Sequence, residues 1–189
     1  MSRFTIHTAA SAPEAKELIE GAEKAFGFLP NLLAVMGESP ALLEGYMTLA
    51  GIFDTTDLSP TERQIVLMVN NRLNGCSYCM SAHTGIATSQ GVPSDVIEAL
   101  RDGTELADAK LEALRVFAVR VNESRGWPGQ GDIDALLSAG YTRRTVFEVV
   151  LGTSLKVMSN YTNHIADTPL DSAFAAVEWS PAELAGSAN

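Results

Sequence analysis

The residue types best suited to chemistry are two cysteines and a histidine in one short segment, Cys76, Cys79 and His83. The cysteines have the spacing Cys-x-x-Cys, and His83 follows Cys79 by four residues. On an α-helix these side chains share one face, with Cys79 and His83 as direct neighbours. An imidazole and a helix N-terminus both favour the thiolate, the nucleophilic form of cysteine. The pattern therefore predicts a redox dithiol: peroxide oxidises Cys79 to a sulfenic acid, and Cys76 condenses with it to form a disulfide.

The elements around this segment must present the cysteines at the start of a helix. Asn74-Gly75 is a turn signal, since both residue types tolerate positive φ. Residues 77–89 contain no proline and one glycine, and we expect them to form the cysteine helix. Before the turn, Ser59-Pro60-Thr61-Glu62 has the pattern of a capping box, which predicts a helix from there to about residue 73.

Apolar residues at helical spacing, interrupted by proline and glycine, predict further helices along the rest of the chain. They are expected at residues 13–25, 32–36, 41–53, 95–101, 106–123, 133–138 and 142–166. A loop is expected at 125–131, and residues 186–189 are expected to fray. Because no segment alternates with a period of two, the predicted fold class is all-α, a compact multi-helix domain.

The composition limits the compartment and the partners. The formal net charge of -10 argues against nucleic acid and anionic membrane surfaces. Residues 1–12 lack the apolar stretch of a secretory signal, and no apolar run approaches the roughly 18 residues that span a bilayer. We therefore expect a cytoplasmic protein. In a reducing cytosol, a Cys-x-x-Cys pair is redox-active or metal-binding rather than a permanent disulfide.

The motif Cys76-x-Tyr78-Cys79-x-x-x-His83, preceded by Leu73-Asn74-Gly75, resembles the alkylhydroperoxidase D-like, peroxidase-related branch of the carboxymuconolactone decarboxylase superfamily. Residues 26–33, 39–42 and 160–164 are similar to the same branch. The resemblance implies one all-α domain over residues 1–189, with its core at about 26–171, which assembles as a homo-oligomer, either trimer or hexamer. It implies Cys79 as the peroxidatic and Cys76 as the resolving cysteine, with His83 in a proton relay. The expected activity is that of a thiol-dependent hydroperoxide reductase, with a small-molecule hydroperoxide as the substrate, or of a disulfide reductase. An external thiol donor resets the disulfide, and no bound cofactor or metal is required.

One position departs from the family pattern. A glutamate commonly stands twelve residues before the first cysteine, and this chain has Gln64 there. Glu62 lies two residues away, which turns it by roughly 200° around the helix, and it belongs to the capping box. Glutamine orients a water or an imidazole but does not exchange a proton. We therefore expect a slow or altered peroxidase unless another carboxylate substitutes, and Glu148 is the candidate.

Several residues and the function as a whole allow other interpretations. Tyr78 either hydrogen-bonds a substrate or packs, and Asn160 and His164 either line the pocket or satisfy buried backbone groups and the helix end. The two cysteines and His83 also have the donor types of a zinc site, although no second cysteine pair exists. For the protein, the alternatives are a decarboxylase or lactone-processing enzyme with incidental cysteines, and a non-enzymatic metal or redox sensor.

Overall fold

The structure is a computed structural model that describes residues 2–181, so the predicted fraying of residues 186–189 lies outside the described part. Within residues 2–181 the chain forms nine α-helices, two 3-10 helices and no strand, which confirms the predicted all-α class. The elements are η1 (Pro13–Ala15), α1 (Lys16–Phe26), α2 (Asn31–Met36), α3 (Pro40–Asp54), α4 (Pro60–Leu73), α5 (Ser77–Ser89), α6 (Ser94–Asp102), α7 (Ala109–Glu123), α8 (Gln130–Ser138), α9 (Arg143–Ala166) and η2 (Ser172–Val177).

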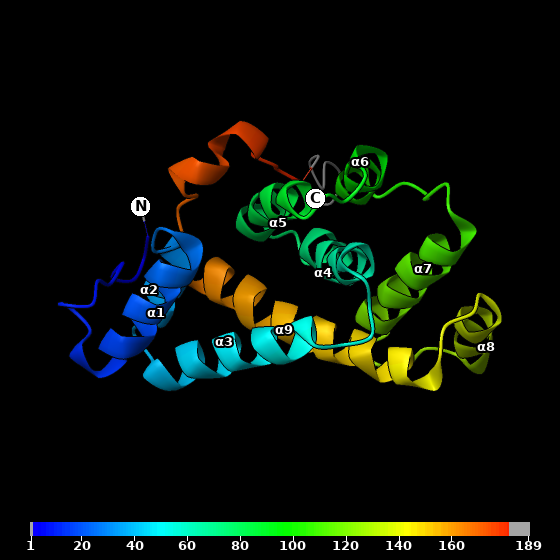
Figure 1. The fold of residues 1–189 in the computed structure, drawn as a ribbon, viewed down its shortest axis with the longest axis horizontal. Helices are drawn as coiled ribbons and strands as arrows, with labels where there is room; N and C mark the ends of the chain where they lie inside the picture. The colour runs from blue at the N-terminus through cyan, green and yellow to red at the C-terminus, as the bar shows by residue number, and fades with distance from the viewer. Residues whose placement is uncertain (1, 182–189) are drawn as a thin grey trace, which may run out of the picture.

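Helix α4 lies at the centre of the bundle, where it packs against α5, α6, α7 and α9. Helix α9 runs along the length of the molecule with α3 beside it, while α1 and α2 lie at one end and α7 and α8 at the other (Figure 1). The segment after α9, which contains η2, turns back over α5 (Figure 1). The cysteine helix α5 is therefore packed against η2 and α9, which are distant from it in the sequence, as well as against its neighbours α4 and α6.

The predicted bounds of the cysteine helix are confirmed, but several other predicted boundaries are wrong. The helix expected from residue 13 begins with the 3-10 helix η1, and α1 starts only at Lys16. The helix expected from residue 106 begins at Ala109, because the Asp108 carboxylate accepts hydrogen bonds from two backbone N–H groups and caps it there. The loop expected at 125–131 is shorter, because α8 already begins at Gln130.

The predicted capping box at the start of α4 is confirmed. Glu62 N donates to Ser59 Oγ at 3.3 Å, and Ser59 N donates to Glu62 Oε2 at 2.8 Å. The box fixes the start of α4. Gln64, in the next turn, faces the bundle interior and is buried.

We expect Ser59→Ala to lower the free energy of unfolding by about 1 kcal/mol, because the first turn of α4 loses a side-chain acceptor. Urea denaturation followed by circular dichroism measures the change. Ser154→Ala removes an exposed hydroxyl bonded within α9 and is the control, with an expected change below about 0.5 kcal/mol. Wild-type stability in Ser59→Ala would contradict the assignment of the cap.

Helix α9 passes very close to α3 and α4 at Gly152. A Cβ added there would lie 2.7 Å from Val66 Cγ1 and 2.9 Å from the Phe53 ring. Such distances are too short for real Cβ atoms, so the crossing requires glycine. Lys156 lies one helical turn further along the same face of α9. This crossing therefore sets how deeply Lys156 enters the bundle.

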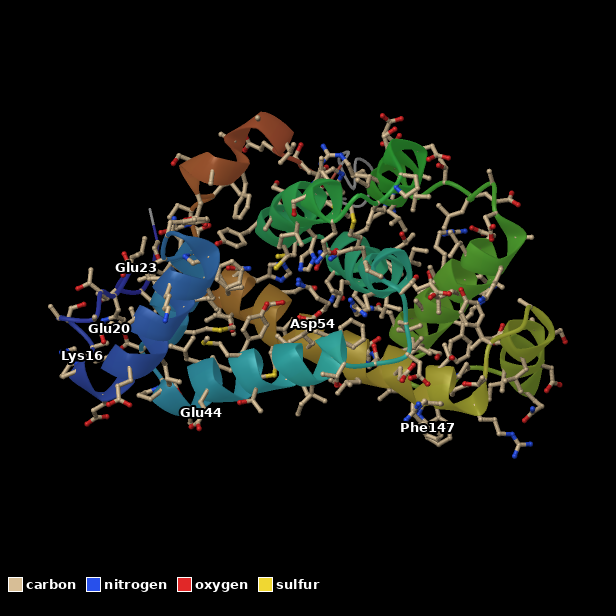
Figure 2. The ribbon with its side chains drawn as sticks, viewed as in Figure 1. Lys16, Glu20, Glu23, Glu44, Asp54 and Phe147 are labelled. Carbon is tan, nitrogen blue, oxygen red and sulfur yellow. The ribbon has the colours of Figure 1, made fainter. Side chains whose placement is uncertain are left out.

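The acidic surplus of the composition lies on the outside of the fold. Glu20, Glu23 and Glu44 project from α1 and α3 away from the bundle (Figure 2). The pair of Glu20 with Lys16, at 3.8 Å, is half exposed on both sides, and such pairs contribute only about 0–1 kcal/mol. Within residues 2–181, no helix combines the length and the apolar character that crossing a membrane requires.

Candidate active site

The two cysteines lie at the start of α5, and both are free thiols. Cys76 is the N-cap residue and Cys79 lies in the first turn, and each is only 1% exposed. The chain reaches this position through Gly75, whose φ of 67° is left-handed, whereas Asn74 ends α4 with a φ of -80°. The predicted turn therefore depends on the glycine rather than on both residues.

One amide group bridges the two sulfur atoms. Asn163 Nδ2, from α9, lies 3.1 Å from Cys79 Sγ and 3.8 Å from Cys76 Sγ. The thiol of Cys76 also hydrogen-bonds the sulfur of Cys79. One thiol directly beside the other is the arrangement that a reversible disulfide requires.

The surroundings make Cys79 the reactive thiol. Burial opposes its ionisation, but the hydrogen bond from Cys76 and the positive charge of Lys156 outweigh burial and lower the pKa of Cys79 to about 5. The hydrogen bond to Cys79, together with burial, raises the pKa of Cys76, so Cys76 remains a protonated thiol. These opposite shifts make Cys79 the more readily ionised of the two thiols.

A chain of polar side chains leads away from the cysteines. Lys156 Nζ, on a residue that is 1% exposed, lies 3.0 Å from His83 Nε2. His83 Nδ1 lies 2.9 Å from Gln64 Oε1, and Gln64 Nε2 donates to Gln90 Oε1 at 2.9 Å. Burial and then the charge of Lys156 hold the pKa of His83 well below its ordinary value. The predicted direct activation of Cys79 by His83 is therefore corrected, because the charge beside the thiolate belongs to Lys156.

We expect the alkylation rate of Cys79 to be half-maximal near pH 5, because only the thiolate reacts and the pKa is lowered to about 5. Below that pH the thiolate gains a proton and the rate falls, whereas toward neutral pH the rate stays level. Iodoacetamide labelling followed by peptide mass spectrometry gives the profile. In urea-unfolded protein, the control, the midpoint should return to roughly 8.5. A midpoint near that value in the folded protein would contradict the activation of Cys79.

Tyr78 uses its hydroxyl to hold three segments of the chain together. The hydroxyl donates to Asp171 Oδ2 and accepts from Leu32 N at 3.2 Å. Asp171 also accepts from Asn31 N at 3.1 Å. Burial, followed by the bond to Asp171, raises the pKa of Tyr78. Of the two predicted roles of Tyr78, these contacts favour packing, with the residue as part of the pocket wall.

A pocket of about 380 Å³ is lined by Cys79. Lys156, His83 and Gln64 supply much of its polar lining. The remaining wall is mainly apolar and aromatic, with side chains that include Phe26, Leu33, Met47, Phe53, Ile86 and Phe174. Such a lining favours an apolar molecule that carries one reactive polar group.

Two residues predicted near the site lie elsewhere. Glu148 Oε1 accepts from Asp57 N at 3.2 Å and lies 3.8 Å from Arg144 Nε, nearer the start of α9. It therefore does not replace the carboxylate that Gln64 lacks. His164 is exposed on the surface and stacks on Tyr161. Neither is among the residues that line the pocket.

Asn160 belongs to a buried network of asparagines behind the cysteines. Its Nδ2 donates to Asn71 Oδ1 at 3.0 Å, and its Oδ1 accepts from Asn74 Nδ2 at 2.8 Å. Asn71 Nδ2 in turn donates to the backbone carbonyl of Cys79 at 3.2 Å. Asn160 therefore supports the start of α5 from behind rather than forming part of the pocket wall.

Lys156, which carries the charge of the site, was not predicted from the sequence. A signal for it exists: Lys156, Asn160 and Asn163 follow one another at i, i+4 and i+7, so they form a polar stripe along one face of α9. All three are buried, although polar stripes on helices usually face solvent. In a sequence, polar residues at i, i+4 and i+7 among apolar helix positions can therefore indicate buried functional side chains.

The donors of the alternative zinc site are not arranged for it. Both ring nitrogens of His83 are in hydrogen bonds with Gln64 and Lys156. In the part of the chain from residue 2 to 181, no group of three or more histidine, cysteine, aspartate and glutamate side chains is placed to hold a metal ion.

Comparison with known proteins finds a family model that resembles part of the chain and solved structures that share its fold. The carboxymuconolactone decarboxylase family model matches residues 40–119, while no curated protein matches the chain in sequence. A peroxidase-related protein of Ralstonia eutropha JMP134, described as an alkylhydroperoxidase AhpD core, has a TM-score of 0.81 at 19% identity, over 92% of this chain and 94% of that one. The debrominase Bmp8, as a variant in complex with 2,3,4-tribromopyrrole, has a TM-score of 0.77 at 22% identity, over 94% of this chain and 97% of that one.

A peroxidase-related protein of Silicibacter sp. TM1040 has a TM-score of 0.74 at 20% identity, over 92% of this chain and 97% of that one. At such identities these likenesses establish the fold. The family model therefore covers residues 40–119, and the chain as a whole has the all-α fold of the alkylhydroperoxidase AhpD core.

Proposed function

We propose that the protein is a thiol-dependent reductase of organic hydroperoxides, with Cys79 as the peroxidatic and Cys76 as the resolving cysteine. The observation that carries the proposal is the Cys79 sulfur, which has a pKa lowered to about 5 and lines an apolar pocket beside a second, protonated thiol. A low-pKa thiolate with an adjacent resolving thiol is the requirement for this chemistry.

The reaction uses the dithiol as a two-electron donor. The Cys79 thiolate attacks the terminal oxygen of the hydroperoxide, the O–O bond breaks, and the alkoxide takes up a proton to leave as the alcohol. Cys79 becomes a sulfenic acid, which Cys76 attacks with release of water and formation of the disulfide. An external thiol donor, in a reducing compartment such as the cytosol, then restores both thiols.

A second candidate is reductive dehalogenation of a halogenated aromatic compound, which the aromatic side chains of the pocket wall favour. The thiolate would take the halogen, the ring carbon would take a proton, and Cys76 would displace halide to give the same disulfide. The dithiol is the electron donor in both reactions, so substrate turnover distinguishes them.

The deciding experiment incubates the reduced protein with cumene hydroperoxide, and separately with 2,3,4-tribromopyrrole and with a carboxymuconolactone. We expect loss of the hydroperoxide, with loss of both thiols for each molecule reduced, and continued turnover when dithiothreitol is supplied. Halide release without hydroperoxide loss would favour the second candidate. Lactone turnover that persists after alkylation of the cysteines would identify a decarboxylase-type enzyme, and inertness towards all three would favour a sensor.

We also propose a homo-oligomer, which the outer face of α9 supports. Exposed apolar side chains form one stripe along this helix: Phe147, Val150, Val157, Tyr161 and Ile165. Phe147 is 73% exposed and points away from the bundle (Figure 2). Burial of this stripe between copies would remove an apolar surface from water. In sedimentation equilibrium we expect wild-type oligomers and a shift to monomers in Phe147→Glu, with Ser154→Ala as the control. A monomeric wild-type protein would contradict this proposal.

A further inference from the structure

His83 is held as a neutral imidazole with its hydrogen on Nδ1. The Gln64 amide donates through Nε2 to Gln90, so its oxygen is the atom that faces His83 Nδ1. An amide oxygen only accepts hydrogen bonds, and Nδ1 must therefore carry the hydrogen. The lone pair of Nε2 is left to accept from Lys156 Nζ at 3.0 Å. A carboxylate at position 64 would support a doubly protonated ring, whereas the Gln64 amide does not.

The transferable proton of the site is consequently on Lys156. The titratable groups that face its ammonium are Cys76, Cys79 and His83 of α5 and Tyr46 of α3. Burial opposes the charge of Lys156, but the negative charge of Cys79 outweighs burial and raises the pKa of Lys156. The resting pair is therefore an ammonium beside a thiolate, each of which keeps the other charged in a buried place.

We propose that Lys156 is the proton donor of this site and protonates the oxygen that leaves when Cys79 attacks a hydroperoxide. The proposal rests on the function proposed above. Lys156 and Cys79 line the same pocket, so a substrate that reaches the sulfur lies beside the ammonium. The Cys79 sulfur bonds to the terminal oxygen, the O–O bond breaks, and the departing oxygen keeps the electron pair and takes one proton from Lys156 Nζ. The products are the alcohol, the Cys79 sulfenic acid and a neutral lysine amine.

The neutral amine then serves the second step. It accepts the proton of the Cys76 thiol, whose sulfur attacks the Cys79 sulfur, and it passes this proton to the departing hydroxide, which leaves as water. When an external thiol reduces the disulfide, Cys79 re-forms as a thiol and gives its proton to Lys156. Within one cycle the amine thus gives a proton twice and accepts a proton twice, and no carboxylate is needed.

Neighbouring groups are less suited to this role. The Tyr78 hydroxyl already donates to Asp171. Burial raises the pKa of Tyr46, which therefore holds its proton more firmly. The hydrogen of His83 is directed at Gln64, away from the pocket sulfur. Lys156 is the group among these that combines charge, a transferable proton and contact with the pocket.

The test separates the charge of Lys156 from its proton. Arginine keeps the positive charge but does not give up a proton at accessible pH, whereas methionine keeps the approximate shape without the charge. Two substrates are compared for each protein: cumene hydroperoxide, whose alkoxide must be protonated, and peroxybenzoic acid, whose benzoate leaves without a proton. The readout is the single-turnover rate of Cys79 oxidation, with the alkylation profile of Cys79 recorded alongside.

In Lys156→Arg we expect a low alkylation midpoint, a rate with peroxybenzoic acid within about tenfold of wild type, and a loss of about 100-fold or more with cumene hydroperoxide. In Lys156→Met the alkylation midpoint should rise and both rates should fall. Their ratio should still shift by about 100-fold against cumene hydroperoxide, because the ratio cancels the smaller thiolate population. This second variant decides the matter if arginine disrupts folding.

Wild-type rates for both substrates in Lys156→Arg would overturn the proposal, since charge alone would then suffice. An unchanged ratio of the two rates in both variants would overturn it as well, because a positioning defect slows both substrates alike. If neither substrate oxidised the wild-type protein, the proposed function itself would be refuted. The alkylation profile would still show whether Lys156 lowers the pKa of Cys79.

Discussion

Replacement of Cys79 by serine is expected to reduce the rate of hydroperoxide reduction by at least about 1,000-fold, the scale of loss seen when an enzyme loses its nucleophile. The pKa of Cys79 is lowered to about 5, so the wild-type protein presents a full thiolate at neutral pH. A serine hydroxyl stays protonated there and is a weak nucleophile. The measurement is steady-state turnover of cumene hydroperoxide with dithiothreitol as the reductant.

Cys76→Ser is the matched control for this loss. It removes the resolving thiol but keeps the nucleophile, so without added reductant we expect one fast turnover that stops at the Cys79 sulfenic acid, which dimedone labels. Comparable multiple turnover in Cys79→Ser and wild type would show that Cys79 is not the nucleophile. A burst from Cys79→Ser and none from Cys76→Ser would reverse the two roles.

The largest expected loss of stability comes from Gly152→Ala, which should lower the free energy of unfolding by about 2–3 kcal/mol through overpacking. The new methyl group would lie 2.7 Å from Val66 Cγ1 and 2.9 Å from atoms of the Phe53 ring, so α9 must move away from α3 and α4. Because Lys156 is one turn away, the alkylation midpoint of Cys79 should rise together with the loss of stability. Urea denaturation and the alkylation profile check both expectations.

Gly21→Ala provides the control for this substitution. Gly21 lies within α1, and a Cβ added there meets nothing within 4 Å. Alanine should therefore raise the stability by about 0.5–1 kcal/mol through its higher helix propensity, and it should leave the Cys79 profile unchanged. Two alanine substitutions in helices would thus act in opposite directions. Equal effects of both would show that α9 has room at Gly152.

The elements of the fold were predictable where the signal is local. The capping box at Ser59 and the turn at Gly75 depend on residues within a few positions of each other, and they mark where α4 and α5 begin. The spacing of apolar residues then predicts how far each helix continues. The start of α7 was less predictable, because apolar periodicity begins at residue 106 while the Asp108 carboxylate ends up as the cap. Boundaries of this kind depend on which of several side chains takes the free N–H groups.

The site was predictable only along one helix. The positions of Cys76, Cys79 and His83 relative to one another follow from helix geometry. The ring contacts of His83 do not, because its partners Gln64 and Lys156 are 19 and 73 positions away and come from α4 and α9. The charge that activates the thiol depends on tertiary packing and on no motif around the cysteines, which is why the histidine was predicted in its place.

The crossing at Gly152 also bears on attempts to copy this site into another scaffold. A designer who transplanted the reactive side chains without the close approach of α9 to α3 and α4 would change how deeply Lys156 enters the bundle. The tight approach of α9 would have to be transplanted too, although its glycine has no functional group. The minimal portable unit is thus a backbone arrangement as much as a set of residues.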